Sequence, residues 1–211
     1  LENIEDFERA GPGLGVKYLV REMKDFAGKR VVIAGGGDSA VDWAVQLSSI
    51  TAKIYVVHRR LKFRAMDESV RKLHVLADAG AIELVTPYQL DRLEGDSGVL
   101  SSVVVKDLDG AERTLDADVL LPFYGLSQSL GPIHEWSLGD TRAGIPVKPT
   151  TAETSRPGVY AIGDVAVYPG KLKLILTGFS EAAFAAHHSY ATVFPEKALH
   201  FEYSTTKGLP D

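Results

Sequence analysis

Three consecutive glycines at positions 35–37 separate an apolar, β-branched run from a segment with helical periodicity. Gly35, Gly37 and Ala40 match the spacing G-x-G-x-x-A. In that pattern the first glycine permits a tight turn, the second lets the backbone approach a phosphate, and the small third residue lets helix and strand pack closely. Main-chain N–H groups at the start of the helix then point toward the anion. The spacing therefore predicts a site that grips the pyrophosphate of a dinucleotide.

The residues on either side of the glycines decide between this site and an ordinary flexible turn. Residues 30–34 form an apolar run that predicts a buried strand. Helical spacing follows the glycines, at Val41, Ala44, Val45 and Ser48. Asp38 or Ser39 can cap the start of this helix and joins the set of cofactor contacts. A plain loop explains the glycines but not the order of strand, turn and helix, so we interpret the chain as nucleotide-binding.

The end of the next predicted strand, residues 53–57, indicates which dinucleotide is bound. An NAD-preferring site places an acidic residue about 20 residues after the glycines, where it binds the ribose 2′-hydroxyl. This chain instead has His58, Arg59 and Arg60, followed by Arg64. Because guanidinium groups suit bidentate contact with phosphate, these four residues predict a site for NADP(H). The alternative is a solvated basic helix start, which is common on protein surfaces.

The composition fits an ordinary globular chain of one or two domains. Of its 211 residues 45% are hydrophobic and 24% are charged, and the formal net charge is −5. This acidic balance disfavours nucleic acid as a partner, which would need a basic face. No apolar run approaches the roughly 20 residues of a membrane helix, and the opening residues are acidic where a secretory signal would be basic. We therefore expect a cytoplasmic protein with no membrane or nucleic-acid partner.

The chain contains no cysteine. This excludes a catalytic disulfide, a thiolate nucleophile, and an iron–sulfur or zinc-thiolate cluster ligated by this chain. His187 and His188 are adjacent, but neighbouring helix positions point in different directions and no carboxylate set completes a metal site. We expect surface and packing roles for this pair and no bound metal. The first residue is Leu1, which suggests a processed product or a chain whose beginning lies elsewhere.

Hydrophobic periodicity predicts an alternating α/β pattern up to about residue 122. After a loop over 1–27 and the glycine turn, the predicted elements are a helix over 38–50, a strand over 53–57, a helix over 67–79 closed by Gly80, and a strand over 82–85. Segments 88–93, 100–106 and 112–115 alternate and are separated by turns, which predicts a three-stranded antiparallel meander. A further buried strand is expected over 117–122.

Beyond residue 122 the sequence changes to loops with few periodic stretches, so a domain boundary is expected there. A strand over 158–162 leads into Gly163 and Asp164, and an alanine-rich helix is expected over about 179–194. Its small side chains, Ala182, Ala183, Ala185 and Ala186, permit unusually close packing. The tail around 200–207 has no helical or strand signature.

Several runs, taken in order, resemble one family, the ferredoxin-NADP reductases of the thioredoxin-reductase-like type. The matching runs are residues 35–40, 58–60 with 63–65, 158–164, 168–172 and 177–183. Any one of them can arise by chance, but together they span most of the chain in the family's order. The resemblance implies an oxidoreductase that binds two dinucleotides, NADP(H) and FAD.

On this resemblance the fold class is α/β: a Rossmann-type NADP-binding domain with a β-meander, plus the C-terminal piece of a second, FAD-binding Rossmann-like domain. The implied organisation is a connection from an N-terminal FAD segment over 1–11, the NADP-binding domain over 12–121, the C-terminal part of the FAD-binding domain over 122–195, and a C-terminal extension over 196–211. The family's first G-x-G-x-x-G, which holds the adenosine diphosphate of FAD, is not found in residues 1–29. We therefore expect a complete NADP domain and an incomplete FAD domain.

The resemblance also carries cofactor roles onto individual residues. Gly163 and Asp164 match residues that contact the flavin ribityl chain or pyrophosphate, although a strand-end turn that satisfies its own backbone is the plainer interpretation. Thr177 precedes a helix that resembles the one facing the flavin pyrimidine edge, where the positive dipole end stabilises charge on the reduced flavin. Tyr203 matches an aromatic residue that stacks over the isoalloxazine ring. Gly125, at the expected hinge between the domains, completes the set.

Thioredoxin reductase, the nearest rival, needs a redox-active cysteine pair where this chain has Leu19 and Glu22. What remains is hydride transfer between NADPH and FAD, followed by one-electron exchange with ferredoxin or flavodoxin, with no acid–base residue required of the protein. A homodimer is expected. The alternative is an NADPH-binding fragment without turnover of its own, because the N-terminal FAD half is absent. Four scattered lysines would steer an acidic carrier protein: Lys171, Lys173, Lys197 and Lys207.

Overall fold

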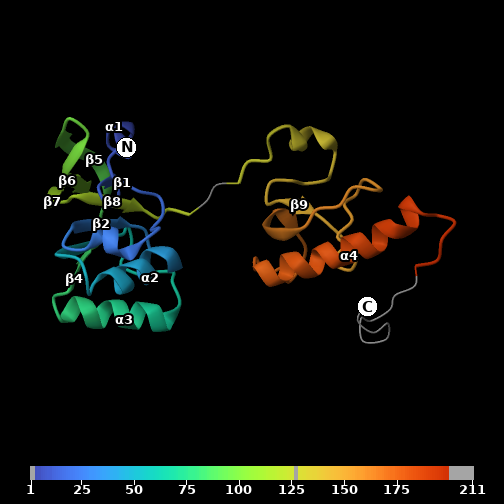
Figure 1. Cartoon of the computed structure of the whole chain (residues 1–211), viewed down its shortest axis with the longest axis horizontal. Coiled ribbons are helices and arrows are strands. Elements are labelled where there is room, and N and C mark those ends of the chain that lie inside the picture. Colours follow the sequence, from blue (N-terminus) through green and yellow to red (C-terminus); the bar gives the residue numbers. More distant parts are fainter. Residues whose placement is uncertain (1–2, 126–127, 200–211) are drawn as a thin grey trace, which may run out of the picture. The chain divides into compact units, whose positions relative to one another are not determined.

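The chain divides into two compact units, Leu1–Leu126 and Ser127–Asp211 (Figure 1). The computed structural model describes residues 3–125 and 128–199. The first unit contains the glycine turn, and the second contains the Gly163 turn and the long C-terminal helix. Each unit has its own hydrophobic clusters.

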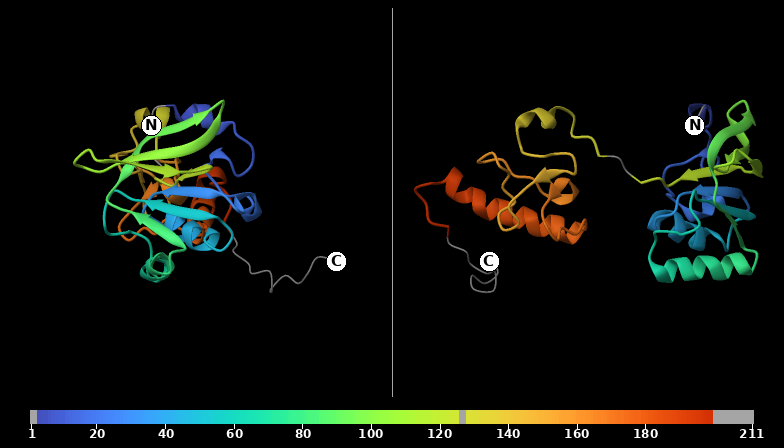
Figure 2. Two further views of the ribbon diagram at one scale, coloured as in Figure 1. Left: turned by 90° about the vertical axis from the view of Figure 1, so that its left-hand side faces the viewer. Right: turned by 180° about the vertical axis from the view of Figure 1, so that it is seen from behind.

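A five-stranded parallel sheet forms the centre of the first unit (Figures 1 and 2). Its order is β1 (Gly15–Val16), β8 (Val119–Pro122), β2 (Arg30–Ala34), β3 (Lys53–Val57) and β4 (Ile82–Val85). Helices α2 (Asp38–Leu47) and α3 (Asp67–Asp78) connect β2 to β3 and β3 to β4. Because the carboxyl ends of parallel strands meet at one edge, the segments that follow β2, β3, β4 and β8 converge there.

Both faces of the sheet are buried, which explains why β2 and β3 are continuous apolar runs after their first residue instead of alternating. In β2, Val31 and Ile33 pack on the α2 and α3 side, while Val32 and Ala34 pack on the opposite side. A three-stranded antiparallel meander covers that second side, and its strands are β5 (Gln89–Asp96), β6 (Val99–Lys106) and β7 (Glu112–Asp116). The predicted α/β pattern and the meander are confirmed.

The N-terminal segment is more ordered than the predicted loop over residues 1–27. It forms helix α1 (Ile4–Glu8), strand β1 and a 3₁₀ helix, Met23–Phe26. Strand β1 has only two residues and is defined by its parallel pairing with β8, in which Gly15 lies opposite Val119. Since no local hydrophobic period marks so short a strand, the partner residues about a hundred positions away create it.

The second unit contains little sheet. Strands β9 (Ile145–Pro146) and β10 (Ala166–Val167) pair in parallel, and short 3₁₀ helices cover Gly131–Trp136 and Gly163–Val165. Its core is a small cluster of Leu130, Leu138, Ile145 and Ala161. Helix α4 runs from Ile175 to Val193. No helix in the described ranges, α4 included, is long and apolar enough to cross a membrane.

In the second unit one predicted strand is wrong, and the predicted helix is present with an earlier start. Residues 158–162 do not form a strand, because within the described residues they make only an isolated antiparallel bridge, between Glu153 and Tyr160. Helix α4 starts at Ile175, four residues before the predicted start at 179, so Thr177 lies inside its first turn instead of before it. Of the four alanines expected to pack closely, Ala182 and Ala185 are partly buried, whereas Ala183 and Ala186 are exposed.

Candidate functional site

The glycine turn between β2 and α2 is shaped by its neighbours. Gly35 has a φ of +154°, and a Cβ atom built on it would lie 2.4 Å from the carbonyl oxygen of Phe123 and 3.0 Å from the Cβ of Ala40. The Phe123 N–H in turn donates to the carbonyl of Ala34 at 2.7 Å. Only glycine fits at position 35, and the small side chain of Ala40 lets α2 approach the strand.

Gly36 is required by His58, which the G-x-G-x-x-A spacing does not reveal. A Cβ atom on Gly36 would lie 2.4 Å from the Cε1 and Nε2 atoms of the His58 ring. That ring is 7% exposed and stacks on Phe63 with centroids 5.3 Å apart. Its Nε2 atom is buried without a hydrogen-bond partner. Burial, followed by the charges of Arg64 and the neighbouring arginines, lowers the pKa of His58, which favours the neutral imidazole.

Gly37 stands in open space, in contrast to its two neighbours. No protein atom lies within 4 Å of a Cβ atom built on it, and it occupies the N-cap position of α2 without a side-chain cap. The prediction that Asp38 or Ser39 caps this helix is wrong, because Asp38 is already the first helical residue and its Oδ1 accepts a hydrogen bond from the Met66 N–H at 2.9 Å. The first N–H groups of α2 thus have no side-chain cap, and Gly37, Asp38 and Ser39 line a cavity, an arrangement suited to an anion.

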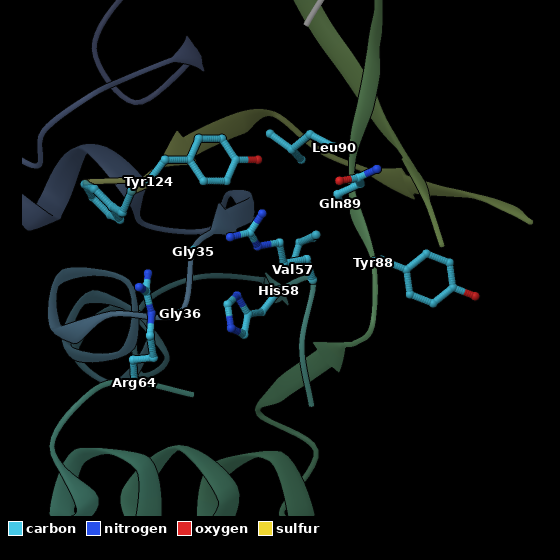
Figure 3. A pocket seen from close by; sticks show the side chains of 11 residues that line it. Gly35, Gly36, Val57, His58, Arg64, Tyr88, Gln89, Leu90 and Tyr124 are labelled. Carbon is cyan, nitrogen blue, oxygen red and sulfur yellow. The ribbon is translucent and has the colours of Figure 1, made fainter. Parts of the chain in front are cut away.

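Two cavities adjoin the glycine turn. The first, of about 440 Å³, is lined by Gly35, Gly36, Val57, His58, Arg59, Arg64, Tyr88, Gln89, Leu90, Phe123 and Tyr124 (Figure 3). The second, of about 660 Å³, is lined by Tyr18, Leu19, Val20, Gly37, Asp38, Ser39, Trp43, Arg64, Pro122, Phe123, Tyr124 and Gly125. Arg64, Phe123 and Tyr124 border both cavities. The two cavities therefore lie next to each other at the glycine turn.

The predicted basic residues are brought together only in part. All three arginines are exposed; Arg59 and Arg64 line the first cavity beside His58, while Arg60 is not among its lining residues. The Arg64 N–H donates to the carbonyl of Gly36 at 2.7 Å. This bond attaches the backbone of a cationic residue directly to the glycine turn. The position of Arg64 is therefore fixed relative to the turn.

The predicted residues of the second unit have separate surroundings. Gly163 has a φ of +73° and begins the 3₁₀ turn in which Asp164 is exposed. Thr177 lies in the first turn of α4, whose N-cap residue Leu174 makes no side-chain cap. Tyr203 lies outside the described residues.

The structure also shows the surroundings of several lysines and histidines of the second unit. Lys171 is not available to steer a partner, because its side chain is buried in an ion pair with Glu181; Lys173 is exposed, and Lys207 lies outside the described residues. The His188 Nδ1 lies 2.9 Å from the Tyr160 hydroxyl. Within residues 3–125 and 128–199 no group of three or more His, Asp or Glu side chains is arranged to hold a metal ion.

Residues 14–186 match the model of one protein family, described as pyridine nucleotide-disulphide oxidoreductase. The chain belongs to that family. Similar curated relatives are the Ferredoxin--NADP reductases of Paramagnetospirillum magneticum, 60% identical over 210 residues, and of Rhodospirillum rubrum, 59% identical over 210 residues. Both alignments cover 100% of this chain, and they cover 61% and 60% of the two relatives. The chain thus spans about three fifths of their length, and the predicted resemblance is confirmed.

Solved structures with a similar fold include two thioredoxin reductases. That of Lactococcus lactis has a TM-score of 0.75 at 24% identity, covering 92% of this chain and 61% of that one. That of T. acidophilum has a TM-score of 0.73 at 25% identity, covering 91% and 60%. These likenesses confirm the predicted fold class. This pyridine nucleotide-disulphide oxidoreductase chain nevertheless contains no cysteine, so it cannot itself form a disulfide.

Several residues that line the site were not predicted from the sequence of this chain. Tyr88, Gln89 and Leu90 follow β4 and line the first cavity, and Tyr124 follows β8 (Figure 3). The ring of Tyr88 points away from the cavity in that view. The available signal was topological, because ligands of open parallel sheets bind outside the carboxyl ends of the strands. Residues directly after the predicted strands 82–85 and 117–122 were therefore candidates.

Proposed function

We propose that this chain provides the NADP(H) site and part of the FAD site of a flavoprotein oxidoreductase that exchanges electrons between NADPH and a one-electron carrier, ferredoxin or flavodoxin. The observation that carries the proposal is the glycine turn. Gly35 and Gly36 are held by protein contacts, whereas Gly37 opens onto vacant space at an uncapped helix start. That combination suits a bound pyrophosphate.

NADP(H) fits the first unit. The pyrophosphate would lie against Gly37, Ser39 and the first N–H groups of α2, close to where Ala40 lets the helix approach the strand. Arg59 and Arg64 line the cavity on one side of the turn and supply guanidinium groups for the 2′-phosphate. Arg60 stands on the same segment with its side chain in solvent, so its contribution is long-range charge. Gly125 borders the cavity on the other side.

The role of His58 in this site is to support the turn and to leave room for the arginines. Its neutral ring lies under Gly36, and its Nε2 atom is the buried polar atom without a partner. A phosphate dianion bound near the arginines would favour the protonated form of the imidazole. The protonated Nε2 atom would then be a hydrogen-bond donor.

FAD fits the second unit in part. The exposed Asp164 carboxylate can accept hydrogen bonds from ribityl hydroxyls, and Gly163 supplies the turn that presents it. Thr177 and the uncapped start of α4 would face the pyrimidine edge, and Tyr203 would stack over the ring system. Bound flavin would accept the two-electron hydride of NADPH and release electrons singly to the carrier.

The domain organisation belongs to the same proposal. Residues 12–121 would form the NADP-binding domain, 122–195 the C-terminal part of the FAD-binding domain, and 196–211 an extension, with 1–11 as a connection. The functional unit would be a homodimer. The alignments leave about two fifths of each relative unmatched. This agrees with an FAD-binding domain of which this chain matches only the C-terminal part.

A second candidate is an NADPH-binding fragment without turnover of its own. The apolar surface of the second unit favours it. Ile175, Leu176 and Phe179 at the start of α4 are 82%, 77% and 73% exposed. Side chains of this kind are normally covered by a partner segment or a ligand.

A visible absorption spectrum, recorded before and after anaerobic addition of NADPH, distinguishes the two candidates. Flavin bands that bleach on addition of NADPH would support the oxidoreductase. A colourless protein that binds NADPH more tightly than NADH would support the fragment. A protein that binds neither FAD nor NADPH would contradict both.

A further inference from the structure

Helix α4 buries one side chain among its nineteen residues, and that side chain is charged. Glu181 is 2% exposed, while the large apolar residues near the start of the helix face outward. This inverts the ordinary amphipathic pattern, in which apolar residues face the core. An isolated buried carboxylate would be very unfavourable, so its contacts must compensate for the lost hydration.

Three donors from three separate positions meet the Glu181 carboxylate. The Gly163 N–H donates to Oε2 at 2.7 Å, and the Tyr168 hydroxyl donates to Oε1 at 2.6 Å. The Lys171 ammonium also donates to Oε1, and its side chain is itself only 6% exposed. Burial acts to raise the pKa of Glu181, but the bonds from Lys171, Tyr168 and Gly163 outweigh it and hold the pKa below its ordinary value.

The same helix touches the Gly163 turn at a second point. A Cβ atom built on Gly178 would lie 3.4 Å from the Cα atom of Gly163, so the helix passes close to the turn and a larger side chain would meet its backbone. Gly178 and Glu181 are three residues apart and therefore lie on one face of α4. The close approach at Gly178 and the hydrogen bond from the Gly163 N–H to Glu181 thus hold the turn that carries Asp164 against the first half of α4.

We propose that Glu181 is a positioning residue, which holds the Gly163–Asp164 turn and the start of α4 in the relative geometry needed to bind FAD. This inference rests on the proposed function for its ligand. Glu181 would touch no flavin atom and would act through Asp164. Its carboxylate charge is needed because an amide can accept from only one oxygen, and its NH₂ group would face donors.

The first test leaves flavin out. In Glu181→Gln, the Gly163 amide loses a charged acceptor, and its hydrogen exchange measured by NMR in the 211-residue chain should accelerate about tenfold or more. Glu135→Gln removes the same charge from an exposed position of the second unit and should leave this rate unchanged. An unaltered Gly163 rate in folded Glu181→Gln would overturn the proposal.

A milder variant keeps the test decisive if Glu181→Gln does not fold. Tyr168→Phe removes one donor and leaves the ion pair with Lys171 and the bond to Gly163. Because the carboxylate is then held less firmly, Gly163 exchange should rise about threefold. No rise in a folded Tyr168→Phe protein would also overturn the proposal.

The second test measures FAD in the full-length gene product. Glu181→Gln should raise the FAD dissociation constant about tenfold and lower the flavin midpoint potential at saturating FAD, while Glu135→Gln does neither. Asp164→Asn should weaken FAD binding less in the Glu181→Gln background than in the parent, since both act through one turn. Additive losses would overturn the positioning role. A parent protein that binds no FAD would instead contradict the proposed function, and the Gly163 exchange rate would still decide whether Glu181 positions the turn.

Discussion

The two units of this chain differ in how completely they cover their own apolar residues. In the first unit every residue from Val31 to Ala34 is 0% exposed, with helices on one face of the sheet and the meander on the other. In the second unit the core is a cluster of four buried residues, and the longest helix presents its apolar side chains outward. The comparison teaches that the first unit contains the partners its sheet requires, whereas the second unit has apolar surface suited to further contacts.

The largest effect is expected when the two units are separated. Leu1–Leu126 alone should unfold in one cooperative transition, because the contacts of its two clusters lie inside it. Ser127–Asp211 alone should unfold in a broader transition at a lower temperature and should bind a hydrophobic dye, because its core is small and its longest helix exposes apolar side chains. Circular dichroism with thermal unfolding and dye fluorescence measures both. An isolated second unit that unfolds as sharply and at as high a temperature as the first would break the comparison.

Within the first unit, the next largest effect is expected at Gly35. Gly35→Ala places a methyl group 2.4 Å from the Phe123 carbonyl in a backbone conformation that favours glycine. We expect a loss of about 3 kcal/mol in the free energy of unfolding, measured by urea denaturation.

Gly37→Ala is the matched control for that substitution. It adds the same methyl group where no protein atom lies within 4 Å, so stability should change by less than about 0.5 kcal/mol. Its effect should fall on the ligand instead, as weaker NADPH binding in a calorimetric titration, because the methyl would occupy the space proposed for phosphate. Equal stability losses in both variants would contradict the assignment of a structural role to Gly35 and a ligand-binding role to Gly37.

The arginines sharpen the comparison at the level of binding. Arg59→Ala should weaken NADPH binding about 10- to 100-fold and NADH binding much less, because it removes a charge-assisted contact to the 2′-phosphate. Arg60→Ala removes the same charge from a side chain outside the cavity and should have a smaller effect. Calorimetric titration with both nucleotides measures the ratio. Equal losses for NADPH and NADH in Arg59→Ala would contradict the assignment of NADP(H).

The smallest effect is a pH dependence of the first unit. Asp118 accepts hydrogen bonds from the Arg30 N–H at 2.8 Å and from its guanidinium at 2.7 Å, and these bonds hold the pKa of the carboxyl below its ordinary value. The unfolded state therefore binds a proton first as the pH falls. The contribution, about 1 kcal/mol, should be complete above the unfolded pKa of about 3.9 and lost progressively below it.

Urea denaturation at about pH 6 and about pH 3 measures this contribution. Asp118→Asn should reduce the difference between the two pH values. An Asp118→Asn variant with the full acid sensitivity of the parent would assign that sensitivity to other carboxylates.

The sequence predicted best those elements whose signal is local. Strands 53–57 and 82–85 agree with the structure to the residue, because each is a short apolar run bounded by turn residues. The glycine turn also had a local signature. The separate roles of the three glycines had no local signature. The requirement for Gly36 comes from the His58 ring, which packs there only after folding.

The remaining features depend on neighbours that lie far away in the sequence. Strand β1 exists through pairing with β8, and the residues that complete the first cavity come from segments after β4 and β8. A lysine is expected to be solvated, and nothing in the local sequence of Lys171 indicates otherwise. Its buried position is explained by the ion pair with the buried Glu181. The expected strand over 158–162 failed for the opposite reason, because the described residues offer it no continuous ladder.

The bond between the Arg64 N–H and the Gly36 carbonyl couples two parts of the proposed site, the glycine turn that would bind the pyrophosphate and an arginine that would bind the 2′-phosphate. Arg64 is 28 residues from Gly36 in the sequence, but at 2.7 Å a displacement of the turn displaces the arginine backbone with it. With Arg64 as a proposed contact of the 2′-phosphate, a change in the shape of the turn would therefore alter the preference between NADPH and NADH as well as the affinity for both. Switching that preference alone requires exchanging side chains around a backbone left untouched.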